Sequence, residues 1–354
     1  MELMRLCKER ARRNPRRVVF PDSLDERAIL AVRELSTQGY ARPVLLANPF
    51  EMRAFCWQKQ LGMAGVPVID PMRSVNRWRY AEHLRQRMPK ASAEEIDARL
   101  SEPLWFAAAM LACGDVDLCI GGNLSSTANV LRAAIHAVGL AEGNKTVSSI
   151  FFMLPPESPC GQARQQMLIF TDCGVVPQPT PEQLADIAIG AAANYRRVTG
   201  REARVAFLSF SSHGSAHHPA VNAVRQAVDI VRSRAPQLTV DGDLQLDAAI
   251  VPQIAAQKAP GSPVGGNANV LVFPSLEAGN IGYKIAQRLG GYTALGPMIQ
   301  GLARPMHDLS RGCSTEEMVE VTLLAMLMAD GAPLEAGEAE GVSGRVDDTM
   351  LRTA

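Results

Sequence analysis

The feature that most constrains the fold of this chain is a series of short, uninterrupted apolar runs separated by helical segments. Four predicted strands built on such runs are residues 17–20, 117–120, 204–210 and 270–273. A strand that is apolar along its whole length, rather than at every second residue, is buried on both faces of its sheet. Such strands in alternation with helices are typical of a parallel sheet covered on both sides. The sequence therefore predicts an α/β protein.

Helical segments fill the intervals between these runs. Residues 25–38 carry apolar side chains at helical spacing, and Pro181 marks the start of another helix. An apolar helix at 315–328 closes the fold, and its several hydrophobic faces predict a place in the core or at a subunit contact. Residues 331–354 have no period and are expected to form a loose tail. Surface turn chemistry is predicted for three aspartates around one glycine, namely Asp241, Asp243 and Asp247.

Composition and charge exclude several classes of protein. A chain of 354 residues suggests two domains, and 47% hydrophobic residues can form sizeable cores. The 36 basic and 36 acidic residues cancel, which gives no reason to expect a nucleic-acid partner or an anionic membrane. No apolar run approaches the roughly 18 residues of a membrane-spanning helix. The first residues lack the apolar segment of a secretory signal.

The seven cysteines favour a reducing compartment. None belongs to a C-x-x-C pair and their number is odd, as expected of free thiols rather than a disulfide framework or a zinc site. Cys313 is the one closest to the chemistry described next, and no histidine stands at a short fixed spacing that would mark a Cys–His nucleophile. We therefore predict a cytoplasmic protein without a metal centre.

A polar segment late in the chain, residues 305–317, concentrates groups suited to chemistry. It holds the hydroxyl of Ser310 and the guanidinium of Arg311, with a thiol and carboxylates beside them. Glu317 follows Ser314 by three positions, as in a capping box at the start of a helix. Backbone N–H groups at such a start favour an anion, and an arginine grips phosphate or carboxylate in two places. For this segment alone, a polar loop with a helix cap is the simpler interpretation.

A second segment of the same character follows the apolar run at 117–120. A glycine pair permits a close backbone approach, and the hydroxyls of Ser126 and Thr127 stand at the start of a helix. Arg132 lies about one and a half turns into that helix. The order of strand, glycine pair, hydroxyl cluster and helix is typical of a loop that binds an oxyanion. It lacks the lysine of a Walker loop and the spacing of a dinucleotide fingerprint. A bound anion and plain helix capping are equally good interpretations.

Two other polar regions are weaker candidates. Residues 211–215 follow the strand at 204–210, at the end where open parallel sheets hold ligands. Residues 72–101 are locally basic and include Arg87. A solvated face is the default interpretation of this basic stretch, and binding of a polyanionic ligand by one or two of its arginines is the alternative.

Several blocks together resemble phosphate acetyltransferase, the phosphotransacetylase family. The blocks that match, in chain order, are residues 126–128, 171–173, 208–215, 273–284 and 308–312. The match runs in order over most of the chain, and the long block at 273–284 makes it highly specific. The absence of added N-terminal regulatory domains and the segment 122–132 especially resemble the ethanolamine-utilisation, EutD-like branch.

The resemblance implies the two-domain isocitrate/isopropylmalate-dehydrogenase-like fold, with parallel-sheet α/β domains and a cleft between them. The first domain would combine residues 1–147 and 297–330, and the second would span 148–296. Residues 331–354 would remain as the tail. A homodimer is also implied, in the cytoplasm or within a bacterial microcompartment.

The reaction implied is the reversible transfer of an acetyl group between CoA and phosphate through a ternary complex. It needs no metal, no further cofactor and no covalent acyl-enzyme. The expected ligands are CoA, acetyl-CoA, acetyl phosphate and inorganic phosphate, with no nucleic acid and no membrane partner. This chemistry requires a base, a hydrogen bond to sulfur, and cations for the phosphate and the developing oxyanion.

The resemblance also assigns roles by motif position. Ser310 would stabilise the CoA thiolate, and Arg311 would hold the phosphate or carbonyl oxygen. The base would be Glu317, where many relatives carry aspartate, and Asp308 is the alternative base. Substrate binding is expected of six further residues: Ser126, Thr127, Arg132, Arg87, Asn280 and Lys284.

Three other functions stay open. Transfer of a propionyl or butyryl group would use the same machinery, and the residues that touch the acyl chain cannot be identified from the sequence. A dehydrogenase of the same fold would need a nucleotide site, yet no G-x-G-x-x-G follows a strand and no carboxylate trio is apparent. A non-catalytic component of a microcompartment is the third alternative.

Overall fold

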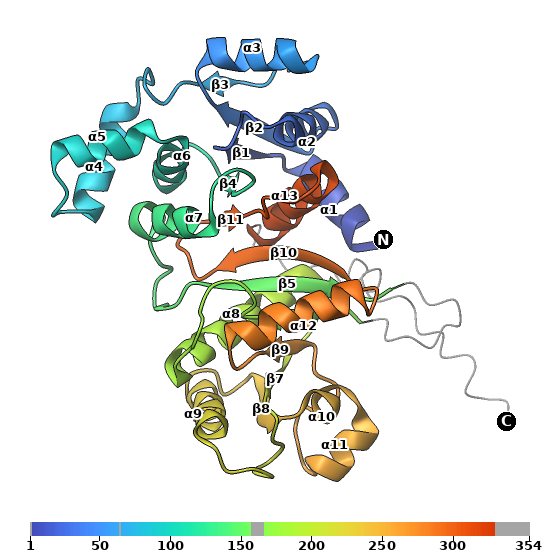
Figure 1. Cartoon of the computed structure of the whole chain (residues 1–354). Helices are drawn as coiled ribbons and strands as arrows, with labels where there is room; N and C mark the ends of the chain where they lie inside the picture. Colours follow the sequence, from blue (N-terminus) through green and yellow to red (C-terminus); the bar gives the residue numbers. More distant parts are fainter. Residues whose placement is uncertain (1, 64, 157–165, 330–354) are drawn as a thin grey trace, which may run out of the picture. The chain divides into compact units, whose positions relative to one another are not determined.

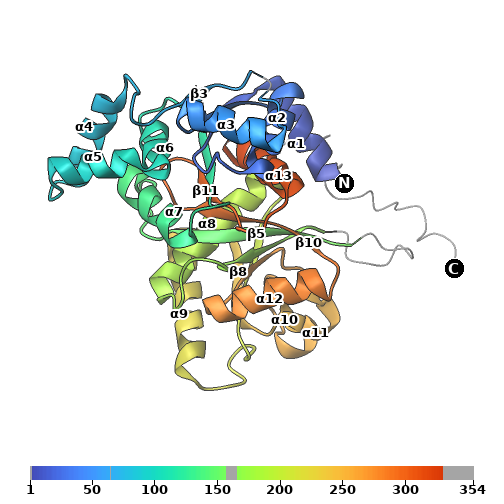
Figure 2. The same cartoon turned by 45° about the horizontal axis from the view of Figure 1, so that its top comes forward.

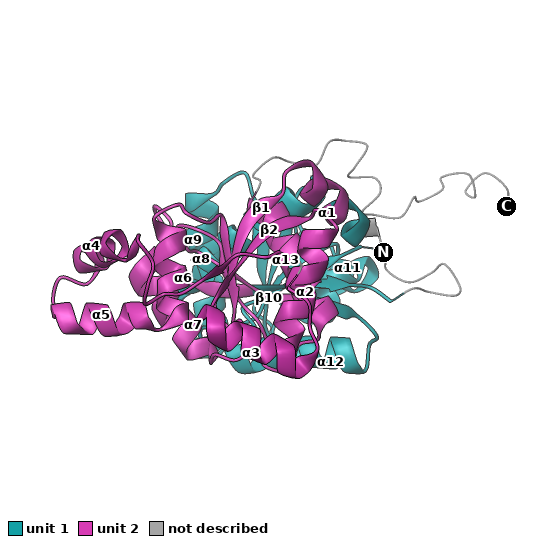
Figure 3. Cartoon of the chain, turned by 90° about the horizontal axis from the view of Figure 1, so that it is seen from above, with its two compact units in different colours: residues 1–6, 150–294, 331–354 teal, residues 7–149, 295–330 magenta. Residues whose placement is uncertain are grey.

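The computed structural model describes residues 2–63, 65–156 and 166–329. The chain divides into two compact units, coloured separately in Figure 3, and each is described by itself. Unit 1 comprises residues 1–6, 150–294 and 331–354, and unit 2 comprises residues 7–149 and 295–330. Among the described residues, the chain passes between the units after residues 6, 149 and 294, where the sequence predicts crossings after residues 147 and 296. The predicted tail at 331–354 lies outside the described residues.

Unit 2 is built on a parallel sheet of five strands in the order β11-β4-β1-β2-β3 (Figure 1). The strands are β1 (Arg16–Phe20), β2 (Ala41–Leu46), β3 (Val68–Ile69), β4 (Leu118–Gly121) and β11 (Met306–Asp308). Val44, Val19, Cys119 and Met306 stand in register across four strands and form one apolar row of the core. The strands predicted at 17–20 and 117–120 are confirmed. Strand β11 was not predicted, because two of its three residues are polar.

Helices cover both faces of this sheet (Figure 2). The helices of this part of the chain are α1 (Glu2–Arg13), α2 (Glu26–Thr37), α3 (Pro49–Lys59), α4 (Arg77–Arg87), α5 (Ala93–Ser101), α6 (Pro103–Ala112), α7 (Thr127–Ala133) with a π-helical continuation (Ala134–Val138), and α13 (Thr315–Ala329). Helix α13 packs against α2 and β4 and is buried along most of its length. The core position predicted for this helix is therefore confirmed.

The second sheet has six strands in the order β10-β5-β6-β9-β7-β8, of which β6, β9, β7 and β8 lie wholly in unit 1. The strands are β5 (Ser148–Leu154), β6 (Leu168–Thr171), β7 (Arg204–Leu208), β8 (Thr239–Leu244), β9 (Val270–Val272) and β10 (Thr293–Gln300). The accompanying helices are α8 (Pro181–Thr199), α9 (Pro219–Arg234), α10 (Leu246–Ile250), α11 (Pro252–Lys258) and α12 (Leu276–Arg288). Strands β6, β9, β7 and β8 pair in parallel, whereas β5 is antiparallel to β6. The sheet is therefore mixed, a common variant of the predicted parallel sheet.

Two of the three aspartates around Gly242 do not lie in a surface turn. Asp241 and Asp243 belong to β8 and are 3% and 0% exposed. His213 and Arg232 bond Asp241 at 2.9 and 3.2 Å, and Arg225 bonds Asp243 at 2.8 Å. The surface prediction was wrong because these partners come from α9 and the loop after β7. Without such partners, burial of a charged carboxylate would cost a large amount of free energy.

Candidate functional site

The candidate site of unit 2 lies at the carboxyl ends of its parallel strands. Strand β4 ends at Gly121 and β11 at Asp308, and these two residues are partners in the parallel register. The loops that follow, 122–126 and 309–314, therefore start side by side, and each leads into a helix. The structure thus brings together the two polar segments singled out in the sequence. They meet at the sheet edge where open α/β proteins hold ligands.

The loop after β4 is organised around a carboxylate from the loop after β1, that of Asp22. Its Oδ2 accepts the N–H groups of Gly122, Leu124 and Ser125 at 2.9, 3.1 and 3.0 Å. Its Oδ1 accepts the Ser125 hydroxyl at 2.7 Å. The glycine loop is therefore an anion cradle, but the anion that these N–H groups bind is the protein's own carboxylate. Sequence analysis missed Asp22, because nothing local to it indicates a partner 100 residues further along the chain.

The two loops meet at Thr127 and Asp308. The Thr127 hydroxyl donates to Asp308 Oδ2 at 2.6 Å. The buried Oδ1 of Asp308 has no hydrogen-bond partner in the described part of the chain. Burial raises the pKa of Asp308 to about 6; the Thr127 bond opposes this shift and the charge of Asp22 adds to it. Carboxyl groups with a pKa raised in this way are concentrated at functional sites.

Titration of Asp308 gives a pH-dependent prediction for Asp308→Asn. The folded protein holds the Asp308 proton up to about pH 6, whereas the unfolded chain releases it near the ordinary value of 3.8. The free energy of unfolding therefore falls as the pH rises through this interval. Asparagine does not titrate, so the variant should not lose stability in this way. Above about pH 6 it should be more stable than the unaltered chain by up to about 3 kcal/mol, and below pH 3.8 it should show no such gain.

Thermal unfolding below and above this interval measures the effect. The neighbouring His307, whose burial lowers its pKa to about 4, titrates in both proteins and cancels in the comparison. Equal changes in stability at both pH values would contradict the assignment of a raised pKa to Asp308.

Gly122 allows its loop to close over Asp308. Its φ of +100° lies in the left-handed region. A Cβ at this position would overlap Asp308 Oδ1 and lie 2.7 Å from the backbone of Leu309. The requirement for glycine is therefore both conformational and steric.

We expect Gly122→Ala to destabilise the protein by about 3 kcal/mol, because left-handed strain and overpacking add. Gly143→Ala is the matched control: its φ is +73° and a Cβ there would meet no atom within 4 Å. The control should cost about 1 kcal/mol, from strain alone. Denaturant unfolding of the two variants measures the difference, and equal losses would show that the contact with Asp308 is unimportant.

The loop after β11 presents the two side chains expected to meet the substrate. Ser310 and Arg311 are both exposed. Ser310 Oγ accepts the N–H of Gly312 at 3.2 Å, which leaves the hydroxyl proton for another acceptor. Within the described residues, the Arg311 guanidinium makes no hydrogen bond or ion pair. It is therefore available for an external anion.

Glu317 completes the predicted capping box at the start of α13. The Ser314 N–H donates to Glu317 Oε2 at 2.9 Å, and the Glu317 N–H donates to Ser314 Oγ at 3.1 Å. The Glu317 side chain lies at the surface, whereas Asp308 is only 2% exposed. The two candidate bases thus differ in a simple way: Glu317 is accessible but holds a cap, and Asp308 has the raised pKa but is enclosed.

The predicted phosphate ligands of unit 2 lie on or against one helical run, formed by α7 and its π-helical continuation. Ser126 caps α7 by accepting the N–H of Asn129 at 3.3 Å, and exposed Arg132 donates to Asn129 Oδ1 at 2.8 Å. Arg87 donates through Nε and Nη2 to two backbone carbonyls of the π-helical continuation of this run, at 3.2 and 3.3 Å. Arg87 is therefore held against the same helical run that carries Arg132.

The two predicted ligands of unit 1 lie on α12. Asn280 Nδ2 donates to the carbonyl of Cys173 at 3.1 Å, and Lys284 Nζ donates to Asn280 Oδ1 at 2.8 Å. The pair is linked by these bonds to the loop after β6, which belongs to the block at 171–173 that resembles a family motif.

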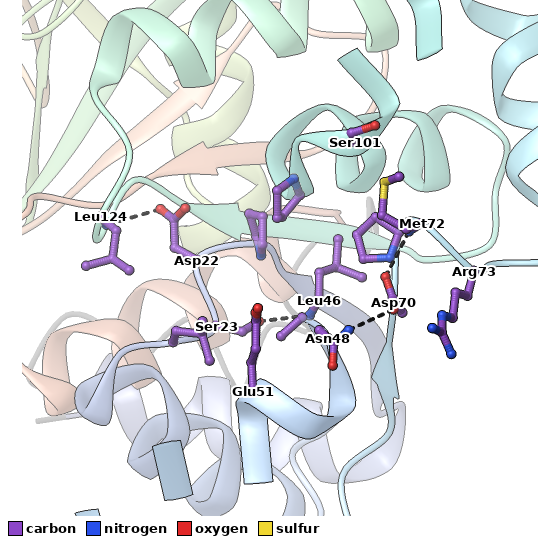
Figure 4. Close-up of a pocket in the computed structure, with 15 residues that line it drawn as sticks. Asp22, Ser23, Leu46, Asn48, Glu51, Asp70, Met72, Arg73, Ser101 and Leu124 are labelled. Atoms are coloured by element: carbon purple, nitrogen blue, oxygen red, sulfur yellow. Dashed lines mark hydrogen bonds between the residues drawn. The ribbon is translucent and has the colours of Figure 1, made fainter. Parts of the chain in front are cut away.

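A pocket of about 550 Å³ opens beside the site, at the carboxyl ends of β1, β2 and β3 (Figure 4). Its volume falls in the usual range for small-molecule sites. Asp22 and Leu124 line it, so it borders the cradle loop, and Asn48, Asp70 and Arg73 supply further polar groups. Sequence analysis did not find this pocket, because its lining comes from segments far apart in the chain, from Pro21 to Leu124.

The described residues contain neither a metal-binding cluster nor a membrane-spanning helix. No group of three or more His, Cys, Asp or Glu side chains is placed to hold a metal ion. None of the described helices combines the length and the apolar character needed to span a bilayer.

The fold and these groups define the class, an α/β protein with anion-directed side chains at the carboxyl edge of a parallel sheet. The sequence profile of the phosphate acetyl/butaryl transferase family matches residues 2–326. The chain therefore belongs to this family, and the resemblance found in its motifs is confirmed.

Individual relatives agree with this placement. The phosphate acetyltransferase of Acetivibrio thermocellus is 40% identical over 324 residues, which is 91% of this chain and 96% of that protein. The phosphate acetyltransferase of Paracoccus denitrificans is 41% identical over 323 residues, covering 90% and 96% of the two chains.

Solved structures support the predicted fold class. The EutD phosphotransacetylase from Staphylococcus aureus is 34% identical, with a TM-score of 0.83 over 93% of this chain and 98% of that chain. A phosphotransacetylase from Streptococcus pyogenes gives a TM-score of 0.86 at the same identity and coverage. A structure from Salmonella typhimurium assigned to the dehydrogenases shares the fold alone, with 14% identity and a TM-score of 0.54. The dehydrogenase-like fold predicted from the motifs is thus confirmed.

Proposed function

We propose that this chain catalyses the reaction of acetyl-CoA and phosphate to give acetyl phosphate and CoA, and its reverse. The observation that carries the proposal is that the loops after β4 and β11 meet at the Thr127–Asp308 pair, in a chain that is 40% identical to a phosphate acetyltransferase. The exposed Arg311 guanidinium and the exposed Ser310 hydroxyl are groups of the kind that acyl transfer to phosphate requires.

The chemistry follows from the groups in the loop. In the direction of acetyl-CoA formation, the CoA thiolate attacks the carbonyl carbon of acetyl phosphate. The carbon–sulfur bond forms, the bond from carbon to the phosphate oxygen breaks, and phosphate leaves. The base takes the thiol proton, the Ser310 hydroxyl donates a hydrogen bond to the thiolate sulfur, and Arg311 neutralises the phosphate and the developing oxyanion. The proposal includes no metal, no further cofactor and no covalent acyl-enzyme.

We assign the role of base to Glu317. A base must first reach the proton that it removes, and only then does its pKa matter. Oε1 of the exposed Glu317 carboxylate takes no part in the cap, whereas Asp308 Oδ1 is enclosed and Oδ2 receives the Thr127 hydroxyl. Asp308 is then the residue that orients Thr127, and it remains the alternative base.

The substrate contacts proposed for the other residues are compatible with their present bonds. Arg87 uses Nε and Nη2 on helix carbonyls, so Nη1 remains for a phosphate group of CoA. Arg132 uses Nη1 on Asn129, so Nη2 remains. The hydroxyl of Ser126 accepts one bond at the helix cap and still has a proton to donate. Asn280 and Lys284 are proposed as further substrate-binding residues.

Comparison of acyl donors tests the proposed substrate. Thiol release in the presence of phosphate is measured with acetyl-, propionyl- and butyryl-CoA. We expect the highest kcat/KM with acetyl-CoA, and a preference for butyryl-CoA would assign the chain to the longer-chain reaction. Oxidation of a hydroxy acid with NAD and magnesium, in place of thiol release, would support the dehydrogenase alternative.

Ser310→Ala separates binding from catalysis. If the hydroxyl stabilises the thiolate, kcat should fall while the KM for CoA stays near that of the unaltered chain, because the bond forms with the reacting sulfur. Steady-state kinetics at saturating acetyl phosphate measures both constants. A raised KM with unchanged kcat would assign Ser310 to CoA binding alone.

We also propose that the chain forms a homodimer. Three apolar side chains spaced by four residues, Ile281, Ile285 and Leu289, lie along one face of α12 and are 58%, 53% and 83% exposed. A subunit contact would cover this stripe. Light scattering at micromolar concentration should give the mass of a dimer, and a monomer would contradict the proposal.

A cytoplasmic location, within a microcompartment for ethanolamine utilisation, is the last part of the proposal. The resemblance of residues 122–132 to the ethanolamine branch and the similarity to the EutD phosphotransacetylase support it. Fractionation of cells induced with ethanolamine tests it: activity that sediments with the shells is the expected result, and wholly soluble activity would remove the microcompartment from the proposal.

A further inference from the structure

Arg27 has no role in the reaction as described, yet its guanidinium joins the two loops of the site. Nη1 donates to the backbone carbonyls of Arg311 and Cys313 at 2.9 and 2.7 Å, and Nη2 donates to the carbonyl of Asn123 at 3.2 Å. Nε and Nη2 bind the carboxylate of Asp25 at 3.2 and 2.7 Å. These five bonds use all five N–H donors of the guanidinium.

The carboxylate that holds Arg27 is itself fixed. Asp25 caps α2 by accepting the N–H of Arg27 at 3.0 Å, and it accepts the Asn123 side-chain amide at 2.9 Å. Its side chain is 7% exposed, and that of Arg27 is 31% exposed. The start of α2 therefore supplies both the guanidinium that bonds the two loops and the carboxylate that holds it.

Three of the bonds made by Arg27 end on backbone, not on side chains. The peptide carbonyl of Arg311 is bonded to the Cα that carries the exposed Arg311 side chain, and the carbonyl of Asn123 belongs to the cradle loop around Asp22. Loss of the guanidinium would therefore free the 309–313 segment from the 122–125 segment while every side chain of the site remains.

We propose that Arg27 is a positioning residue, which clamps the 309–313 loop to the 122–125 loop and so sets where Ser310 and Arg311 meet the substrate. The inference rests on the proposed function, because it assigns Arg27 to that same site. Lysine cannot replace Arg27, since an ammonium group has three donors and no planar fork.

The test compares Arg27→Ala and Arg27→Lys with Arg17→Ala. Arg17 is a matched control: it also pairs with an aspartate, Asp117, at 3.1 Å and donates to a backbone carbonyl at 3.0 Å. However, it lies at the amino end of β1, away from the strand ends that carry the site. Each variant is assayed for kcat, for the KM of CoA and acetyl phosphate, and for its thermal midpoint.

We expect both Arg27 variants to lose about a hundredfold in kcat, the scale of a displacement of roughly 1 Å in a reacting group. The two KM values should change little, and Arg17→Ala should keep the kcat of the unaltered chain. Guanidinium chloride, added below the unfolding transition, should restore activity to Arg27→Ala but not to Arg27→Lys, whose side chain fills the site. A merely structural role would not produce this rescue.

Three results would overturn the proposal: an unchanged kcat in folded Arg27→Ala, a loss of kcat equal to that of Arg17→Ala, or no rescue by guanidinium. If Arg27→Ala does not fold, Arg27→Lys decides, and an unchanged kcat in that variant rejects the clamp. Failure of the proposed function is recognised separately, because the unaltered chain would then show no acetyl transfer.

Discussion

Arg311→Ala should lose about 3 kcal/mol of transition-state stabilisation, which is a fall in kcat/KM of about a hundredfold or more. The guanidinium is exposed, has no partner within the described residues, and extends from a loop whose backbone is held at the Arg311 carbonyl. It therefore meets the phosphate and the oxyanion without first breaking another bond. Preorganised charge of this kind acts mainly on the transition state.

Two further variants sharpen this test. Arg311→Lys should recover little activity, because a point charge does not reproduce the two parallel bonds of the guanidinium. Arg304→Ala is the control: Arg304 is exposed and basic too, but it precedes β11 at the opposite end of that strand. Steady-state kinetics with acetyl phosphate and CoA compares the three. If Arg304→Ala loses as much as Arg311→Ala, the effect is one of overall charge.

Glu317→Gln should lower kcat by about a hundredfold or more, the scale of general base catalysis by a positioned group. The amide oxygen of glutamine can still accept the Ser314 N–H, so the cap of α13 and the stability of the protein should be kept. Ser314→Ala is the reciprocal control, since it removes the hydroxyl that accepts the Glu317 N–H and leaves the carboxylate. It should cost about 1 kcal/mol of stability with a smaller effect on kcat.

These variants separate the two carboxylates. Activity and thermal unfolding are measured for Glu317→Gln, Ser314→Ala and Asp308→Asn. If Glu317→Gln keeps near-normal turnover while Asp308→Asn is inactive and folded, the base is Asp308. Glu317 would then be only the partner of Ser314 in the helix cap.

Features that depend on neighbouring residues could be predicted from the sequence. The capping box joins residues three positions apart, and the apolar residues 18–20 and 118–120 of the predicted strands reflect burial on both faces. Both require only local pattern and general physical rules. Part of the candidate site could also be predicted, because the family motifs at 126–128 and 308–312 include Thr127 and Asp308.

Features that depend on distant partners could not be predicted. Asp22 binds N–H groups about 100 residues away, and Arg27 reaches a carbonyl 284 residues away. Neither residue has a local pattern that distinguishes it from an ordinary surface charge. The buried aspartates of β8 were misread for the same reason, since the arginines that neutralise them lie on another element.

The most direct test of the account is the phosphate dependence of thiol release from acetyl-CoA by the unaltered chain. Free CoA is measured with a thiol reagent and acetyl phosphate by its conversion to a hydroxamate, in the same reaction mixture. We predict one acetyl phosphate for each thiol released, and no release without phosphate. Thiol release without phosphate, or no release by the folded protein, would contradict the assignment of this site to acetyl transfer between CoA and phosphate.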